Sequence, residues 1–208
     1  MKPEEYLRLE RATEFKSEYI NGEIYAMAGV SREHSLIVTN LGAALHSRLR
    51  GRPCETHLTD LRVSVPDTRL YTYPDALVIC GDPVFVDDIF DTVTNPIAIF
   101  EVLSPSTEGY DRGAKFAHYR RLITLRYYVL ISQGEALVEC YERQDSGGWL
   151  LQEFRGLDAT LLLPTLELAL PLADLYERIS FPVLADEALS HEEYSSQDWI
   201  EKQCFPSQ

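Results

Sequence analysis

Three charged residues in the middle of the sequence have surroundings that suggest chemistry. Glu101 interrupts the apolar run 97–103, and Asp75 stands at the start of the apolar run 75–80. Lys115 is the only lysine in the body of the chain, because the other three lie at positions 2, 16 and 202. Two neighbouring carboxylates repel each other unless a cation lies between them, and Mg²⁺ takes oxygen ligands of this kind. Two carboxylates, a divalent cation and a lysine are the groups used in metal-assisted cleavage of phosphodiester bonds.

The predicted strands bring these groups together. Side chains alternate along a strand, so Glu101 shares a face with Ile99, and Asp75 shares one with Leu77. If the two strands are antiparallel neighbours, the start of one meets the end of the other, and the two carboxylates converge at one edge of the sheet. The helix predicted next in the chain could then project Lys115 back over this edge.

The rest of the pattern predicts a mixed α/β sheet with a helix on each face and added β-hairpins. An Asn-Gly turn indicates the first hairpin, and Ser31 is the predicted N-cap of the longest helix. The strands before the 111–123 helix would pair antiparallel, and the strand after it would return parallel. We expect helices at 3–10, 31–50, 111–123 and 172–179, hairpins at 17–27 and 136–154, and strands at 56–66, 72–81, 95–105, 126–132 and 165–170.

Length and composition indicate one domain, residues 1–182, followed by an acidic tail, residues 183–208. No apolar run approaches the roughly 20 residues of a membrane span, and the charged N-terminus does not resemble a secretory signal. The cysteines at 54, 80, 140 and 204 form no CxxC pair, so we interpret them as reduced thiols of a cytoplasmic protein.

The net charge of −14 argues against a protein that coats nucleic acid non-specifically. A local basic cluster nevertheless includes Arg112, Arg120 and Arg121, which we take as candidate nucleic-acid contacts. The alternative is that these arginines form an ordinary solvated helix face.

Several segments resemble the Uma-two endonuclease family, within the PD-(D/E)xK restriction-endonuclease-like superfamily. The resemblance covers about residues 1–180 and rests on "YPDALVIC", "FEVLSPSTEGYDRGAKFAHYRRL" and "RYYVLIS", in that order, with "EYINGEIYAM" and "EHSLIVTNL" before them. It implies a restriction-endonuclease-like fold and a Mg²⁺- or Mn²⁺-dependent DNase. Asp75 would be the aspartate of the "PD" element and Glu101 the acid of the following strand. The lysine usual two residues after that acid is Leu103 here, so Lys115 would replace it from the next helix.

The leading hypothesis is therefore a metal-dependent nuclease that hydrolyses DNA. Asp75, Glu101 and the Val102 carbonyl would hold the metal, and Lys115 would act on the attacking water or the phosphate. Glu18 and His34 are supporting candidates, although Glu18 could be an ordinary hairpin residue and His34 a capping or packing residue.

Simpler interpretations remain open at this point. Asp75 could end a loop, Arg112 could neutralise a buried Glu101, and Lys115 could lie on the surface. The alternative function is an inactive nuclease-like scaffold that binds nucleic acid or a protein partner. A homodimer would place two sites on the two strands of DNA.

Overall fold

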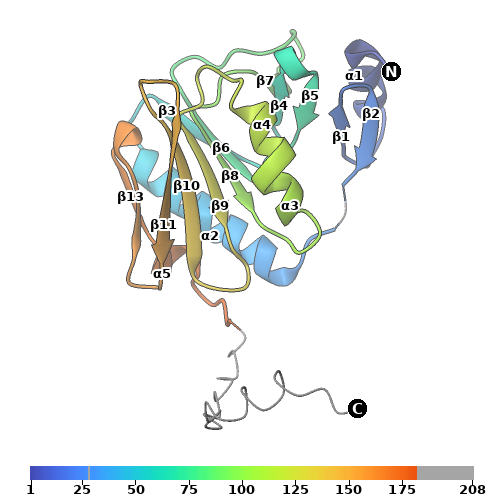
Figure 1. The fold of residues 1–208 in the computed structure, drawn as a ribbon. Coiled ribbons are helices and arrows are strands. Elements are labelled where there is room, and N and C mark those ends of the chain that lie inside the picture. Colours follow the sequence, from blue (N-terminus) through green and yellow to red (C-terminus); the bar gives the residue numbers. More distant parts are fainter. Residues whose placement is uncertain (28, 182–208) are drawn as a thin grey trace, which may run out of the picture.

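The computed structural model describes residues 1–27 and 29–181, and a six-stranded sheet forms its centre (Figure 1). The strand order is β11-β10-β9-β8-β6-β3. The strands are β3 (Cys54–Leu58), β6 (Ala76–Cys80), β8 (Ala98–Val102), β9 (Tyr127–Ile131), β10 (Leu137–Arg143) and β11 (Trp149–Arg155). Only β8 and β9 pair in parallel within this sheet. The predicted mixed α/β class is confirmed, as is the parallel return after the helical crossover.

A second sheet was not expected from the sequence. Its order is β2-β1-β5-β4-β7, built from β1 (Ser17–Ile20), β2 (Glu23–Ala26), β4 (Arg62–Val65), β5 (Leu70–Thr72) and β7 (Thr92–Val93). The strand predicted over 56–66 is wrong as one element, because it divides into β3 and β4, which belong to different sheets. The break occurs where Thr59 adopts a φ of 41°, a left-handed conformation that ends an extended strand.

Helices cover both faces of the six-stranded sheet (Figure 1). On one face lies α2 (Arg32–Leu49), with the hairpin β12 (Thr160–Leu163) and β13 (Leu168–Pro171) and the short α5 (Leu172–Leu175). On the other lie α3 (Glu108–Tyr110), a π-helix (Asp111–Lys115) and α4 (Phe116–Tyr119). The remaining elements are α1 (Pro3–Glu10) and two 3₁₀ turns, Pro66–Thr68 and Pro164–Leu166.

The helix predictions need two corrections. The helix expected over 111–123 begins at Glu108, passes through the π-helical turn and ends at Tyr119. The helix expected over 172–179 has only the four residues of α5. By contrast, the α2 N-terminus matches the prediction, because Ser31 Oγ accepts a hydrogen bond from the His34 N–H at 3.0 Å.

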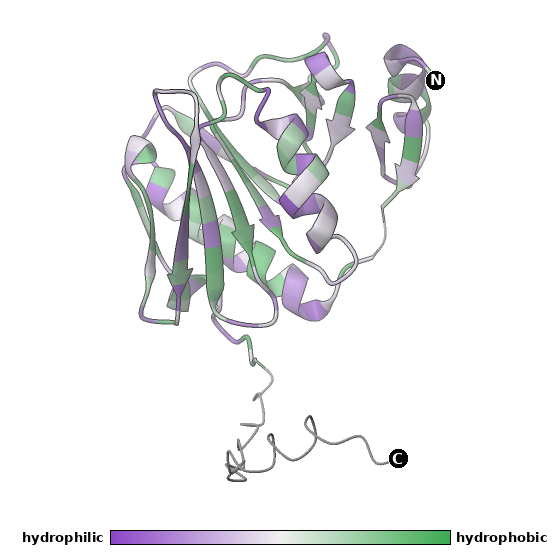
Figure 2. Ribbon diagram, in the orientation of Figure 1, coloured by the Kyte–Doolittle hydropathy of each residue, from purple (hydrophilic) through white to green (hydrophobic). Residues whose placement is uncertain are grey.

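The central strands are hydrophobic on both faces, which explains their apolar sequence (Figure 2). Along β8, Phe100 packs in the cluster that includes α2, and Ile99 packs in the cluster that includes α4. Leu77 and Ile79 on β6 belong to the same cluster as Ile99. Glu101 is therefore on the face that carries the π-helix and α4.

The prediction that the cysteines are reduced thiols is wrong for one pair. Cys54 and Cys80 are directly opposite each other on β3 and β6 and form a disulfide, whereas Cys140 is a buried free thiol. Strand pairing brought together two cysteines that are 26 residues apart in sequence. The cytoplasmic location, which depended partly on reduced thiols, stays a prediction. No helix among the described residues is long and apolar enough to cross a membrane. The predicted tail, 183–208, lies outside the described residues.

Candidate active site

The register of β6 and β8 places Asp75 and Glu101 side by side. Ala76 pairs with Phe100 in antiparallel register, so the preceding Asp75 stands opposite Glu101. The backbone N–H of Val102 donates a hydrogen bond of 2.7 Å to Asp75 Oδ2. His34 Nε2, from the first turn of α2, lies 3.2 Å from the same oxygen. Asp75 thus does more than end a loop, because it ties two strands and a helix together.

Glu101 is almost fully buried and contacts two donors from the helical segment. Lys115 Nζ lies 2.8 Å from Glu101 Oε1, and the Tyr119 hydroxyl donates to the same oxygen at 3.1 Å. Burial raises the pKa of Glu101 well above its usual value, and the charges of Asp111 and Asp75 add to the rise against the opposing effect of Lys115. The site therefore favours either a proton on this carboxyl or further positive charge beside it.

Lys115 is buried at the centre of three carboxylates. Besides Glu101, Asp111 Oδ1 lies 3.4 Å and Glu18 Oε1 3.5 Å from its Nζ. Burial alone would lower the pKa of Lys115, but attraction to Glu101, Glu18 and Asp111 outweighs burial and raises it well above its usual value. Lys115 is consequently a charged lysine, and the alternative of a surface lysine is wrong because only 5% of the residue is exposed.

The π-helical turn fixes how this lysine enters the site. Asp111 and Lys115 are its first and last residues, and π-turns are often found at functional sites. The Tyr128 hydroxyl from β9 donates to the Asp111 carbonyl at 2.9 Å, which anchors the turn to the sheet. The Tyr110 ring lies 5.9 Å from Lys115 Nζ and covers the ammonium from another side.

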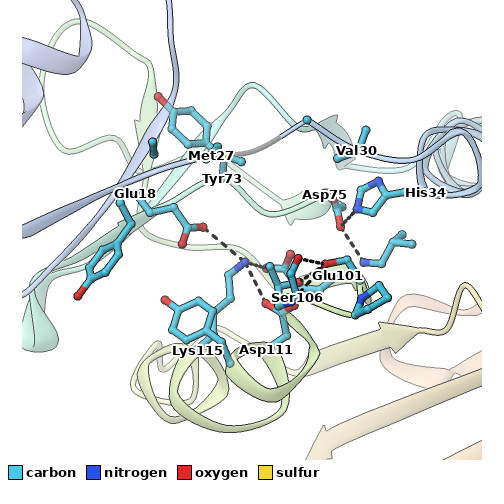
Figure 3. A pocket seen from close by; sticks show the side chains of 18 of the residues that line it. Glu18, Met27, Val30, His34, Tyr73, Asp75, Glu101, Ser106, Asp111 and Lys115 are labelled. Atoms are coloured by element: carbon cyan, nitrogen blue, oxygen red, sulfur yellow. Dashed lines mark hydrogen bonds and ion pairs between the residues drawn. The ribbon is translucent and has the colours of Figure 1, made fainter.

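A cleft of about 690 Å³ opens over these groups. The arm, which we define as residues 1–27, carries α1, β1 and β2 and lines one side of this cleft (Figure 1). Pairing of β1 with β5 joins the arm to the rest of the second sheet. In Figure 3, Glu18 reaches from β1 toward Lys115, while Asp75 and His34 lie at the other end of the site. The structure thus brings together six of the predicted residues around the cleft: Asp75, Glu101, Val102, Lys115, Glu18 and His34.

The predicted arginine contacts lie outside this cleft. Arg112 is paired with Glu108 at 2.7 Å and with Glu139, so the alternative in which it neutralises Glu101 is wrong. Arg120 and Arg121 are exposed on the surface and do not line the cleft. Their role in binding nucleic acid stays a prediction.

Sequence reasoning missed two members of the site. Asp111 contacts Lys115, and Tyr119 donates a hydrogen bond to Glu101. Both lie four residues from Lys115, a spacing that places side chains on one helical face. That four-residue spacing from Lys115 was the sequence feature that could have identified Asp111 and Tyr119 as members of the site.

The carboxylates suit a cation that takes most of its ligands from water and substrate. Among the described residues, no group of three or more acidic, histidine or cysteine side chains has metal-binding geometry. Each carboxylate of the Asp75–Glu101 pair has one oxygen engaged by two donors, Oδ2 and Oε1 respectively. The other oxygen of each remains for a cation such as Mg²⁺, which is commonly held by one or two carboxylates and substrate phosphate.

Comparison with known proteins places the chain in a family. The family model Uma2, described as "Putative restriction endonuclease", matches residues 3–173. The chain belongs to the Uma2 family. Two uncharacterized Synechocystis sp. proteins are similar to it: slr1290 is 36% identical over 87% of this chain and 94% of its own length. The other, sll1609, is 39% identical over 76% of this chain and 89% of its own length.

A solved structure confirms the predicted restriction-endonuclease-like fold. It is described as "a putative nuclease belonging to DUF820 from Anabaena variabilis". The TM-score is 0.69 at 24% identity, and the match covers 85% of this chain and 97% of that one. At this identity the likeness concerns the fold.

Proposed function

We propose that this Uma2-family protein is an endonuclease that hydrolyses DNA phosphodiester bonds with Mg²⁺ or Mn²⁺. The observation that carries the proposal is the pair Asp75 and Glu101 on adjacent strands, with the charged Lys115 2.8 Å from Glu101. Membership in a family described as "Putative restriction endonuclease" supports the same chemistry.

Asp75 and Glu101 would hold the metal, with the Val102 carbonyl as a further ligand. When bound, the metal would offset the phosphate charge and lower the pKa of a water molecule. Glu18 and Asp111 keep Lys115 charged, and His34 orients Asp75 through the 3.2 Å contact. Tyr119 holds Glu101 Oε1, so the other oxygen of this carboxylate would be the one to bind the cation.

The reaction is a hydrolysis. The water oxygen bonds to phosphorus, the bond from phosphorus to the leaving oxygen breaks, and that oxygen takes up a proton while the water releases one. The products are a phosphate monoester and a hydroxyl end. Lys115 would stabilise the negative charge that grows on the phosphate oxygens during this step, which is why a fixed, buried ammonium is useful here.

Single-turnover cleavage tests the assignment. Asp75→Asn and Glu101→Gln should abolish cleavage that depends on Mg²⁺ and that EDTA stops in the wild type. Lys115→Ala should slow the chemical step by about 10²-fold or more, with a much smaller change in DNA affinity.

Arg120→Ala is the matched control, because it also removes a cation from the helical region but lies outside the cleft. It should weaken binding and reduce its salt dependence while leaving the chemical step unchanged. If the two acid variants cut DNA as fast as the wild type, the assignment is wrong. DNA binding without any cleavage by the wild type would instead indicate an inactive scaffold. A homodimer stays a prediction, which the molar mass in solution will decide.

A further inference from the structure

The arm presents an exposed aromatic side chain to the proposed active site. Tyr25 on β2 is paired with Glu18 on β1 in the antiparallel hairpin, so both side chains are on one face of the ribbon. That face lines the cleft, because Glu18 contacts Lys115 and Tyr25 is itself a lining residue. Tyr25 is 48% exposed, and its hydroxyl donates to Glu23 Oε2 on the same strand.

Further apolar residues line the cleft in addition to Tyr25. Met27, 42% exposed, and Val30, 61% exposed, also line the cleft. Pro105 faces the cleft from the turn after β8. Apolar and aromatic side chains of this kind provide a surface for a flat, unstacked base rather than for a phosphate backbone.

The charge of the cleft also disfavours a duplex. Duplex DNA carries two phosphate backbones, and proteins that grip it present several lysine or arginine side chains. Of the residues described, no arginine lines the cleft, and its one lysine, Lys115, is enclosed by three carboxylates. The cleft offers no basic track for a phosphate backbone, which disfavours a duplex with its two backbones more strongly than a single strand.

The volume of the cleft also favours a single nucleotide over a duplex. A volume of about 690 Å³ is in the range of sites that enclose a small molecule. Enzymes that enclose a nucleotide take it from a single strand or extrude it from the duplex, and they read it by stacking on aromatic side chains.

We propose that the cleft takes an unpaired strand of DNA, with a base stacked on Tyr25 and the adjoining phosphate at Asp75 and Glu101. Cleavage and the placing of the phosphate at Asp75 and Glu101 rest on the metal of the proposed function, whereas stacking of the base on Tyr25 does not. The preferred substrate is then single-stranded DNA or the unpaired segment of a flap, rather than fully paired duplex.

Binding measured without cleavage separates the two proposals. The probes are a fluorescein-labelled 12-nucleotide single strand of mixed sequence and the matching 12-base-pair duplex, titrated with protein in EDTA at one fixed salt concentration. Fluorescence anisotropy should show tighter binding of the single strand. Tyr25→Ala should weaken single-strand binding by roughly 5- to 150-fold, the range for loss of one stacked base. Tyr25→Phe should retain the binding, because it keeps the ring.

Phe15→Ala is the matched control. Phe15 is an aromatic residue of the same arm, 83% exposed, and it does not line the cleft. Its removal should leave single-strand affinity unchanged within about twofold. With Mg²⁺ added, a duplex carrying an unpaired flap should be cut faster than the same duplex without the flap.

The outcomes distinguish the two proposals. If the single strand binds through Tyr25 but no DNA is cut, the proposed nuclease function fails and this inference stands. If paired duplex is cut faster than single-stranded DNA, the nuclease function stands and this inference is overturned. Equal affinities of the Tyr25→Ala and Phe15→Ala variants for the single strand, or no single-strand binding by the wild type, would also overturn it.

Discussion

Replacing Lys115 with methionine removes the ammonium while keeping a side chain of similar length, and we expect a large loss of stability. With an effective dielectric constant of about 20, attraction to Glu101 at 2.8 Å amounts to about 6 kcal/mol. Asp111 and Glu18, at 3.4 and 3.5 Å, add about 5 kcal/mol each on the same basis. The desolvation of four buried charges offsets most of this sum.

The net effect follows from what the substitution leaves behind. Removing one partner of a buried ion pair typically costs about 3–5 kcal/mol, because the other charge remains buried without compensation. For a chain of this size such a loss lowers Tm by about 6–20 °C. We expect Lys115→Met to fall in this range when unfolding is followed by circular dichroism in EDTA.

The pH dependence gives a second, independent readout. In the wild type burial already raises the pKa of Glu101 above that of the unfolded chain, and in Lys115→Met this carboxyl also loses its main lowering influence. The folded variant therefore keeps, to still higher pH, a proton that the unfolded chain releases above about pH 4.3. The folded state then binds more protons than the unfolded state, and stability must fall as pH rises from that value. The slope is at most about 1.4 kcal/mol per pH unit for this group. Adding Glu101→Gln should recover part of the lost stability and flatten the slope.

Lys16→Met is the control, because Lys16 pairs with Asp60 at the surface, where such pairs contribute about 0–1 kcal/mol. If Lys115→Met and Lys16→Met lose the same small amount of stability, and neither gains a pH slope, then Lys115 is not buried among the carboxylates in solution.

Three further predictions concern other parts of the molecule. Tyr119→Phe removes one hydrogen bond to Glu101 Oε1 and should lower the free energy of unfolding in urea by about 0.5–1.5 kcal/mol. It should also slow Mg²⁺-dependent cleavage, and unchanged values of both quantities would exclude a positioning role for Tyr119. Reduction of the Cys54–Cys80 disulfide should cost about 3–4 kcal/mol, given the 26-residue separation, and a Tm that is insensitive to dithiothreitol would contradict the bond. Deletion of residues 184–208, which are acidic and weakly apolar, should leave a body that unfolds cooperatively by circular dichroism, and loss of that transition would make the tail part of the core.

Local patterns in the sequence determined much of the site. Alternation along a strand assigned Glu101 to the same face as Ile99, and this face carries the helix with Lys115. The Asn-Gly turn after β1 and the Ser31 cap of α2 could also be predicted from the sequence, because hairpin turns and helix caps depend on a few adjacent residues. These features require no knowledge of which distant segments meet.

Only the tertiary structure decided which charges share the buried site. Glu18 reaches Lys115 from β1, a separate element far away in the sequence, and a sequence gives no distance between such elements. Strand register also joined Cys54 to Cys80, which sequence spacing had suggested were free thiols. Likewise, the division of residues 56–66 between two sheets follows from long-range pairing rather than from propensity. The physical reason is common to all three: the energies of charge pairs, disulfides and strand pairs depend on distances in space, which arise only when the whole chain packs.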